Sequence, residues 1–226
     1  MFCASAAGYG RAVGKLGESW ARAVAAHFGF LEAHGYALAS VDDSSFWQTD
    51  ALYRRPEVAV KIARSVEFRR VEVSLIRLVD DQVAPEPIWL TASAPVHSVL
   101  LDNVLEARDS ELRWRAGAVG GLGDDEVQRQ LAFWAAALRE VCPEFLDGDA
   151  TAIDEAAAML RAKVARHPQQ LTIHLPASAS AAEEARAIVE AERTVPPEVK
   201  VVVNRYQIPS GLPRWGKGFW RKRRPG

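Results

Sequence analysis

The stretch of residues 51–79, ALYRRPEVAVKIARSVEFRRVEVSLIRLV, decides the fold class. Apolar residues occupy every second position at Val58, Val60 and Ile62, and the same period of two returns from Val71 onward. Side chains of a strand point to opposite faces in turn, so this period is typical of a strand with one face on a core and one in water. The sequence therefore predicts an antiparallel meander with strands at residues 36–41, 51–54, 58–63 and 71–79.

Helical periodicity flanks this meander. Residues recur at steps of three and four before Gly35, as on one face of an amphipathic helix: Val13, Leu16, Trp20, Val24, His27 and Leu31. Asp124 and Asp125 open the clearest helical pattern, which Pro143 ends and whose stripe is Val127, Leu131, Trp134, Leu138 and Val141. We expect an α+β protein with an N-terminal helix packed on an antiparallel β-meander, followed by further helices.

Weaker patterns lie between the meander and residue 124. Residues 88–91 fit a further strand. Ser93 and Pro95 fit the first turn of a short helix that runs through Leu105, because the N–H that proline lacks has no partner in a first turn. Residues 112–115 fit a strand or a loop, and the glycine-rich residues 117–123 fit a connector.

A second, smaller unit is predicted from about residue 148. Its order is a helix from Thr151, a strand at 171–175, a helix that Ser180 and Glu183 open as a capping box, and a strand at 199–203. If the two strands pair in parallel, the helix between them is their crossover. The predicted domains are a helix-and-meander domain at 1–147, a small α/β unit at 148–208 and a basic, aromatic tail at 209–226.

The composition is that of an ordinary globular protein, with 49% hydrophobic and 25% charged residues in a chain of 226. No apolar run approaches the roughly 18 residues that cross a bilayer, and the first residues lack the pattern of a signal peptide. Cys3 and Cys142 have neither the number for a disulfide framework nor the spacing of a metal site. We expect a cytoplasmic protein with no transmembrane segment.

The tail has a charge pattern of its own. The net charge of the chain is −1, but residues from 207 on hold six basic residues and no acid, which leaves −7 for the rest. Positive charge beside aromatic rings predicts binding to nucleic acid, to the ribosome or to another anionic partner. The residues predicted for that contact are Arg214, Trp215, Lys217, Phe219, Trp220, Arg221, Lys222, Arg223 and Arg224. The alternative is a terminus that keeps the protein soluble or covers an acidic patch of its own body.

No motif for catalysis, a cofactor or a metal stands out. The carboxylate pairs at 42–43, 80–81 and 124–125 are explained as solvated turns or helix starts, and His27 and His34 lack a third ligand. We therefore predict no catalytic, cofactor-binding or metal-binding residues and favour a protein that is not an enzyme. The enzymatic alternative is a site assembled from scattered residues such as Trp89, His97 and Asp102.

The segment FGFLEAHGY at residues 28–36, followed by ALYRRPEVAVKIARSVEFRRVEVSLIRL at residues 51–78, resembles a layout found in small uncharacterised bacterial proteins. Some of those proteins are immunity-type partners of toxins. The resemblance spans residues 23–78. It implies a helix packed on an antiparallel meander and a role in binding another protein, and it brings no catalytic residues with it.

These features lead to three hypotheses. The first is a non-enzymatic protein-interaction module of the immunity type, which would hold a protein partner with the wet face of the meander and its acidic loops. The second, of another class, is a nucleic-acid or ribosome binder that acts through the basic tail. The third is an enzyme whose site is not visible in the sequence.

Overall fold

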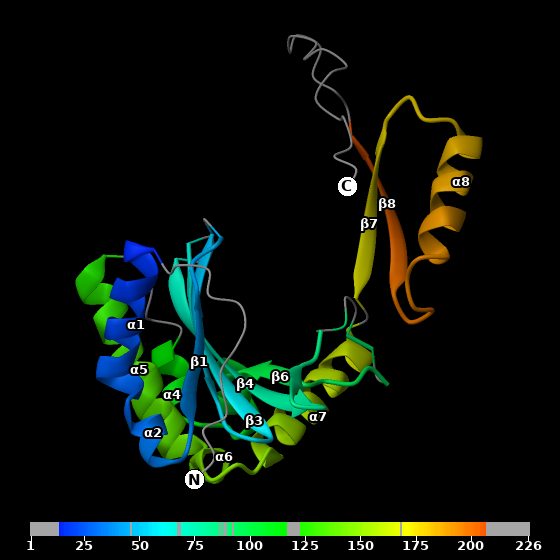
Figure 1. Ribbon diagram of the computed structural model, residues 1–226. Helices are drawn as coiled ribbons and strands as arrows, with labels where there is room; N and C mark the ends of the chain where they lie inside the picture. Colours follow the sequence, from blue (N-terminus) through cyan, green and yellow to red (C-terminus); the bar gives the residue numbers. More distant parts are fainter. Residues whose placement is uncertain are drawn as a thin grey trace. The chain divides into compact units, whose positions relative to one another are not determined.

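The computed structural model describes residues 14–206 except 46, 67–68, 86, 88–89, 92, 117–122 and 168. The chain divides into two units, Met1–Arg166 and His167–Gly226. The first unit is an antiparallel sheet with helices packed on it, and the second is a pair of parallel strands with one helix (Figure 1). The predicted α+β class, with an N-terminal helix on a meander, is confirmed.

The sheet of the first unit is the predicted meander with two short strands added, β5 (Gln82–Val83) and β6 (Ser98–Leu100). Its first five strands follow one another in sequence order: β1 (Ala37–Asp42), β2 (Gln48–Arg54), β3 (Val58–Ser65), β4 (Arg70–Val79) and β5. Strand β6 pairs antiparallel with β4. Asp80 and Asp81 have φ of 51° and 60°, which suits the tight turn between β4 and β5 because two-residue hairpin turns need left-handed backbone.

The helices of the first unit supply one side of its core. They are α1 (Lys15–Phe28), α2 (Phe30–Ala33), α3 (Leu101–Ala107), α4 (Leu112–Ala116), α5 (Asp124–Val141), α6 (Pro143–Leu146) and α7 (Thr151–Arg166). The predicted stripes are buried at Trp20, Val24 and Leu31 of the first helical segment and at Val127, Leu131, Trp134 and Leu138 of α5. Leu16 departs from its stripe and is 52% exposed.

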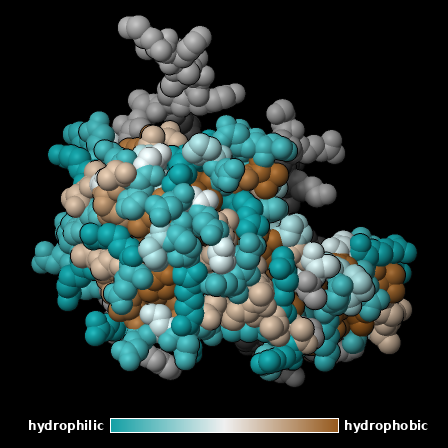
Figure 2. Space-filling view, turned by 90° about the horizontal axis from the view of Figure 1, so that it is seen from below, coloured by the Kyte–Doolittle hydropathy of each residue, from teal (hydrophilic) through white to brown (hydrophobic). Residues whose placement is uncertain are grey.

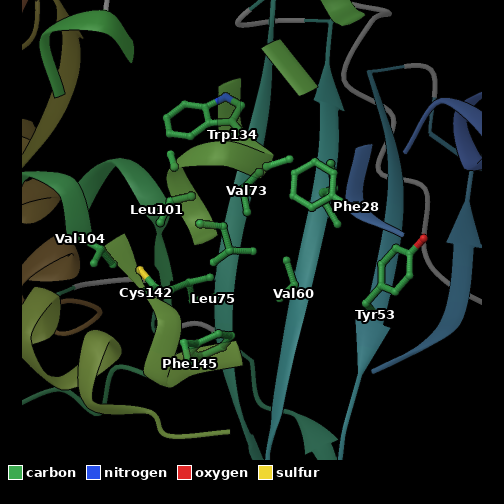
Figure 3. Close-up of a cluster of buried hydrophobic side chains, with 14 of the residues drawn as sticks. Phe28, Tyr53, Val60, Val73, Leu75, Leu101, Val104, Trp134, Cys142 and Phe145 are labelled. Carbon is green, nitrogen blue, oxygen red and sulfur yellow. The ribbon is translucent and has the colours of Figure 1, made fainter. Parts of the chain in front are cut away.

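The core lies between the sheet and these helices. Figure 3 shows side chains of the strands, such as Val60 and Leu75, beside Leu101, Cys142 and Phe145 from helical segments. The opposite, outer face of the sheet is less exposed than simple alternation predicts. Its residues Ala59, Ala63, Ser65, Ser74 and Ile76 are all buried.

The chain after β5 differs from the prediction. Ser93 and Pro95 do not begin a helix, because residues 98–100 first extend along β4, where the N–H of Arg77 also donates to the carbonyl of His97 (2.7 Å). Helix α3 starts only at Leu101. Residues 112–115, expected as strand or loop, are helical in α4. The predicted strand at 88–91 and the connector at 117–123 lie largely outside the described residues.

Helix α7 belongs to the first unit, so the division falls after Arg166 and not at residue 147. Its residues Ile153, Ala156 and Ala157 are buried in the same core as the sheet. Lys163 also bonds Glu106 of α3 at 2.5 Å. Sequence periodicity alone does not show on which neighbour a helix packs.

The second unit has the predicted order of strand, helix and strand. Strand β7 (Gln170–Pro176) pairs in parallel with β8 (Lys200–Tyr206), and α8 (Ala181–Glu192) connects them. The predicted capping box is present, because Ser180 accepts the N–H of Glu183 and Glu183 accepts the N–H of Ser180.

Arg55 ties the turn between β2 and β3 to two helix ends. Its Nη1 donates to the carbonyls of Leu146 (2.8 Å) and His34 (3.3 Å), and its guanidinium lies 5.7 Å from the centre of the Tyr36 ring. It also passes close to Gly148, which has a φ of 98°. The last carbonyls of a helix have no partner within the helix, so Arg55 supplies a hydrogen-bond donor to the ends of two helices at once.

Candidate functional site

A line of carboxylates crosses the outer face of the sheet. Asp42 of β1 lies directly opposite Asp50 of β2, Asp50 lies opposite Ala63 of β3, and Ala63 lies opposite Glu72 of β4. Directly paired residues of antiparallel strands point to the same face. Three acids from three strands therefore share one row.

Asp102 extends this row past the edge of β4. It is the second residue of α3, and it lines a cleft of about 10 Å³ together with Arg70, Glu72 and Trp134. That volume is about what one water molecule needs. We name Asp42, Asp50, Glu72 and Asp102 the acidic row.

Burial dominates the electrostatics of two members of the row. Burial raises the pKa of Asp50 above its ordinary value, although the hydrogen bonds from Gln48 (2.8 and 3.0 Å) and the charge of Lys61 oppose the rise. Asp42 and Glu72 push the same pKa further up. The pKa of Asp102 is raised by burial as well, and Arg70 opposes that rise. The row therefore concentrates negative charge at a cost in free energy.

Two cations lie among these acids. Arg70 bonds Glu72 at 2.7 Å, and Lys61 is paired between Leu52 and Ser74 in the neighbouring cross-strand row. Among the described residues of these strands and of α3, the four acids of the row outnumber these two bases. Carboxylates in such a setting accept charge-assisted hydrogen bonds from guanidinium or ammonium groups.

Exposure falls along the row from β1 to β4. Asp42 is exposed, Asp50 is half-buried, and the side chain of Glu72 is 19% exposed. The accessible end therefore lies at β1, which among the described residues pairs with β2 alone and leaves its other edge open. Two large apolar side chains are exposed in the adjoining segments, Leu38 at 42% and Trp47 at 60%. We name Leu38, Asp42, Trp47 and Asp50, with the open edge of β1, the β1 edge surface.

Several acids of the loops have contacts within the fold. The side chain of Asp43 accepts the N–H groups of Gly14 (2.8 Å) and Gly17 (3.2 Å) and so caps α1. Asp81 bonds Arg54 across the β4–β5 turn at 2.9 Å. Asp124 and Asp125 lie in the first turn of α5, where negative charge suits the helix dipole.

The other sequence-derived candidates are not gathered into a site. The nine tail residues from Arg214 to Arg224, and Trp89, lie outside the described part of the chain. His97 and Asp102 are described. The buried Nδ1 of His97 has no hydrogen-bond partner among the described atoms, and the charges that act on Asp102 are those of Arg70, Glu72 and Glu106. His27 contacts Gln128 (2.8 Å) and His34 contacts Asp147 (3.5 Å), so each has a local partner. Across residues 14–206, less the gaps, no three His, Cys, Asp or Glu side chains are placed to hold a metal ion.

Another hollow is lined mainly by α1 and α5. Its volume is about 240 Å³, below the usual size of a ligand pocket. The lining residues are Leu16, Ser19, Trp20, Ala23, Arg64, Asp124, Val127 and Gln128. On the face shown in Figure 2, hydrophilic side chains predominate and hydrophobic ones form small groups. None of the described helices combines the length and apolarity that crossing a membrane requires.

The row was not visible in the sequence because its members are scattered over residues 42–102. A hint exists in the spacing of Gln48, Asp50 and Leu52, which share the outward phase of one strand, but only the register brings Asp42 and Glu72 into line with them. No protein-family model, curated protein or solved structure matches the chain, so a function is argued from this geometry.

Proposed function

We propose that the chain is a non-enzymatic protein-interaction module, of the kind found in immunity partners, which binds a basic segment of another protein at its β1 edge surface. The observation that carries the proposal is the direct pairing of Asp42 with Asp50 on the outer face of the sheet. Like charges directly opposite each other destabilise a sheet, by up to roughly 1 kcal/mol. A cationic partner would remove that cost on binding.

The surroundings of this pair suit a protein partner. An open strand edge offers backbone N–H and C=O groups to an extended segment, and exposed tryptophan is common among residues that contribute most to protein interfaces. Trp47 supplies exposed apolar area next to β2 in the sequence. Leu38 pairs with the buried Tyr53 and so adds exposed apolar area at the inner side of the same strand edge. The acids would then select a segment rich in Arg or Lys and speed its association.

The test compares three tagged proteins as baits in lysate of the source organism. They are the wild type, Asp42→Asn/Asp50→Asn, and a control, Glu111→Gln/Glu140→Gln, which makes the same change in net charge at two exposed positions in other elements. We expect a basic protein that the wild type and the control both retain and that the Asp42→Asn/Asp50→Asn variant loses. Equal retention by all three would show that the β1 edge surface is not the binding site.

A fourth bait distinguishes binding at the β1 edge surface from binding of nucleic acid by the tail. It ends after Pro209 and so lacks all six basic residues of the tail. Retention that disappears with this truncation, and also with nuclease or moderate salt, would assign the binding to the tail. Retention that survives truncation but not the Asp42→Asn/Asp50→Asn change supports the acidic site.

A further inference from the structure

The second unit has almost no buried core of its own. Helix α8 has no buried residue, and among the described residues of this unit Val199, at 6% exposed, is the one buried hydrophobic side chain. Parallel strands normally occur in sheets covered on both faces, and a two-stranded sheet is marginal alone. The described part of this unit therefore leaves apolar side chains that further strands or helices could cover.

Among the described residues, β7 and β8 each pair on one side alone, and the two strands differ in charge. Strand β8 carries Lys200, and charged residues, Lys above all, are a common protection of an edge strand against pairing. Strand β7 has the sequence QLTIHLP, with no Asp, Glu, Lys or Arg, and the structure records no bulge in its pairing with β8. Pro176 stands only at its end. The β7 edge is thus the unprotected one.

The β7 edge is also complementary to itself. Its half-buried residues Leu171, Ile173 and Leu175 share one face, while Gln170, Thr172 and His174 are exposed on the other. In an antiparallel pair of two β7 strands centred on Ile173, the first face would pair Leu171 with Leu175 and Ile173 with itself. The second face would pair Thr172 with His174. No charged side chain other than a protonated histidine would enter the pair.

The helices fit the same arrangement. Helix α8 contacts both β7 and β8, so two copies would be displaced by about two strand spacings, roughly 10 Å. That value is the upper end of the 8–10 Å between axes of packed helices. A two-fold axis normal to the sheet keeps both helices on one face, where Val189 is 47% exposed in the single chain.

We propose that the second unit binds a second copy of this chain through β7, which gives a four-stranded sheet in the order β8, β7, β7 of the partner, β8 of the partner. This interface is independent of the β1 edge surface. It assigns the two-fold axis to Ile173 and leaves β8 as the outer, charged edge on each side.

The first test is sedimentation velocity on the full chain over a wide concentration range, with Thr172→Lys and the matched control Asn204→Lys. Both positions are exposed on the face away from the apolar residues, and they lie on neighbouring strands. We expect a dimer for the wild type and the control, and dimerisation weaker by about tenfold or more for Thr172→Lys. A wild type that stays monomeric, or equal behaviour of the two variants, would overturn the proposal.

The second test uses disulfide cross-linking and does not depend on a destabilising change. Ile173→Cys places two thiols opposite each other on the axis, within the Cα separation that a disulfide spans. Val203→Cys is the matched control, since Val203 pairs with Ile173 on the same face but belongs to β8. In a Cys3→Ser background, we expect mild oxidation to give covalent dimers with Ile173→Cys only. Cross-linking through both positions, or through neither, would contradict pairing centred on Ile173.

Discussion

The side-chain oxygen of Gln130 accepts a hydrogen bond from the backbone N–H of Val71 over 2.5 Å, in the buried interior of the first unit. One helical turn further on, the indole Nε1 of Trp134 donates to the carbonyl of the same Val71 at 3.1 Å. Strand β6 pairs with β4 only from Ser74 to Ile76, so it does not reach Val71. Two side chains of α5 thus take the place that a neighbouring strand would occupy, and they fix the helix to the sheet.

Replacing Gln130 tests that contact. We expect Gln130→Leu to lower the free energy of unfolding by about 1–3 kcal/mol, because it leaves the buried N–H of Val71 without its acceptor. Urea denaturation measures the difference. Gln128→Leu, on the exposed face of the same helix, is the control and should change stability much less. Equal effects of the two changes would mean that the Gln130 bond contributes nothing specific.

Asp50→Asn tests how far the acidic row lowers the free energy of unfolding. The raised pKa of Asp50 means that the folded protein holds this proton more tightly than the unfolded chain does. The stability supplied by protonated Asp50 is therefore fully present below its ordinary pKa of 3.8 and lost as the pH rises through the folded value. We expect the variant to be more stable than the wild type by about 0.5–1 kcal/mol at neutral pH, with a difference that shrinks toward pH 3.8. Denaturation at a series of pH values checks this, and a pH-independent difference would contradict it.

Arg108→Lys tests the contacts of a partly buried arginine. Arg108 donates to Glu155 through Nε (2.7 Å), to Glu144 through Nη2 (2.5 Å) and to the carbonyl of Val141 through Nη1. Lysine keeps the charge but cannot reproduce three donors in a fixed fork. We expect a loss of about 1–3 kcal/mol in urea denaturation. Arg129→Lys, which changes an exposed arginine paired with Glu126 within α5, should lie within about 0.5 kcal/mol of the wild type.

Thiol labelling of Cys142 reports on opening of the core. Its side chain is fully buried, and burial raises the pKa of the thiol to about 12. The reactive thiolate is therefore scarce and inaccessible in the folded protein. In a Cys3→Ser background we expect labelling of the native chain to be slow and to accelerate in Gln130→Leu as its stability falls. Rapid labelling of the folded Cys3→Ser protein would show that the helices around Cys142 open without global unfolding.

Elements with strong periodicity were predictable from the sequence. The strands from 51 to 79, the stripe of α5 and the capping box at Ser180 follow local rules, and the structure contains them close to the expected bounds. Strand β6 was not predicted, because three residues are too few to show a period. Pro95 also suggested a helix start that the pairing with β4 displaces.

The candidate site was less predictable for a different reason. Asp42 was assigned to a solvated turn together with Asp43, yet the first belongs to β1 and the second caps α1. Whether a residue belongs to the strand or to the following turn depends on the pairing register. The register in turn depends on contacts between segments that are distant in the sequence. The packing of α7 was hard to predict for the same reason. Its alanines form only a weak apolar stripe, and the sequence does not show on which surface that stripe packs.

The contact between Arg55 and Gly148 links the changes that these two positions can undergo during evolution. A β-carbon added at Gly148 would lie 3.0 Å from the guanidinium carbon of Arg55, and the backbone there has a φ of 98°. A side chain at 148 would therefore press on Arg55, which its hydrogen bonds to two carbonyls hold in place. Replacing Arg55 by a smaller residue would make room at 148 for an asparagine or aspartate, which tolerate left-handed backbone. Among descendants of a common ancestor, variation at 148 should accordingly be more frequent where position 55 has changed.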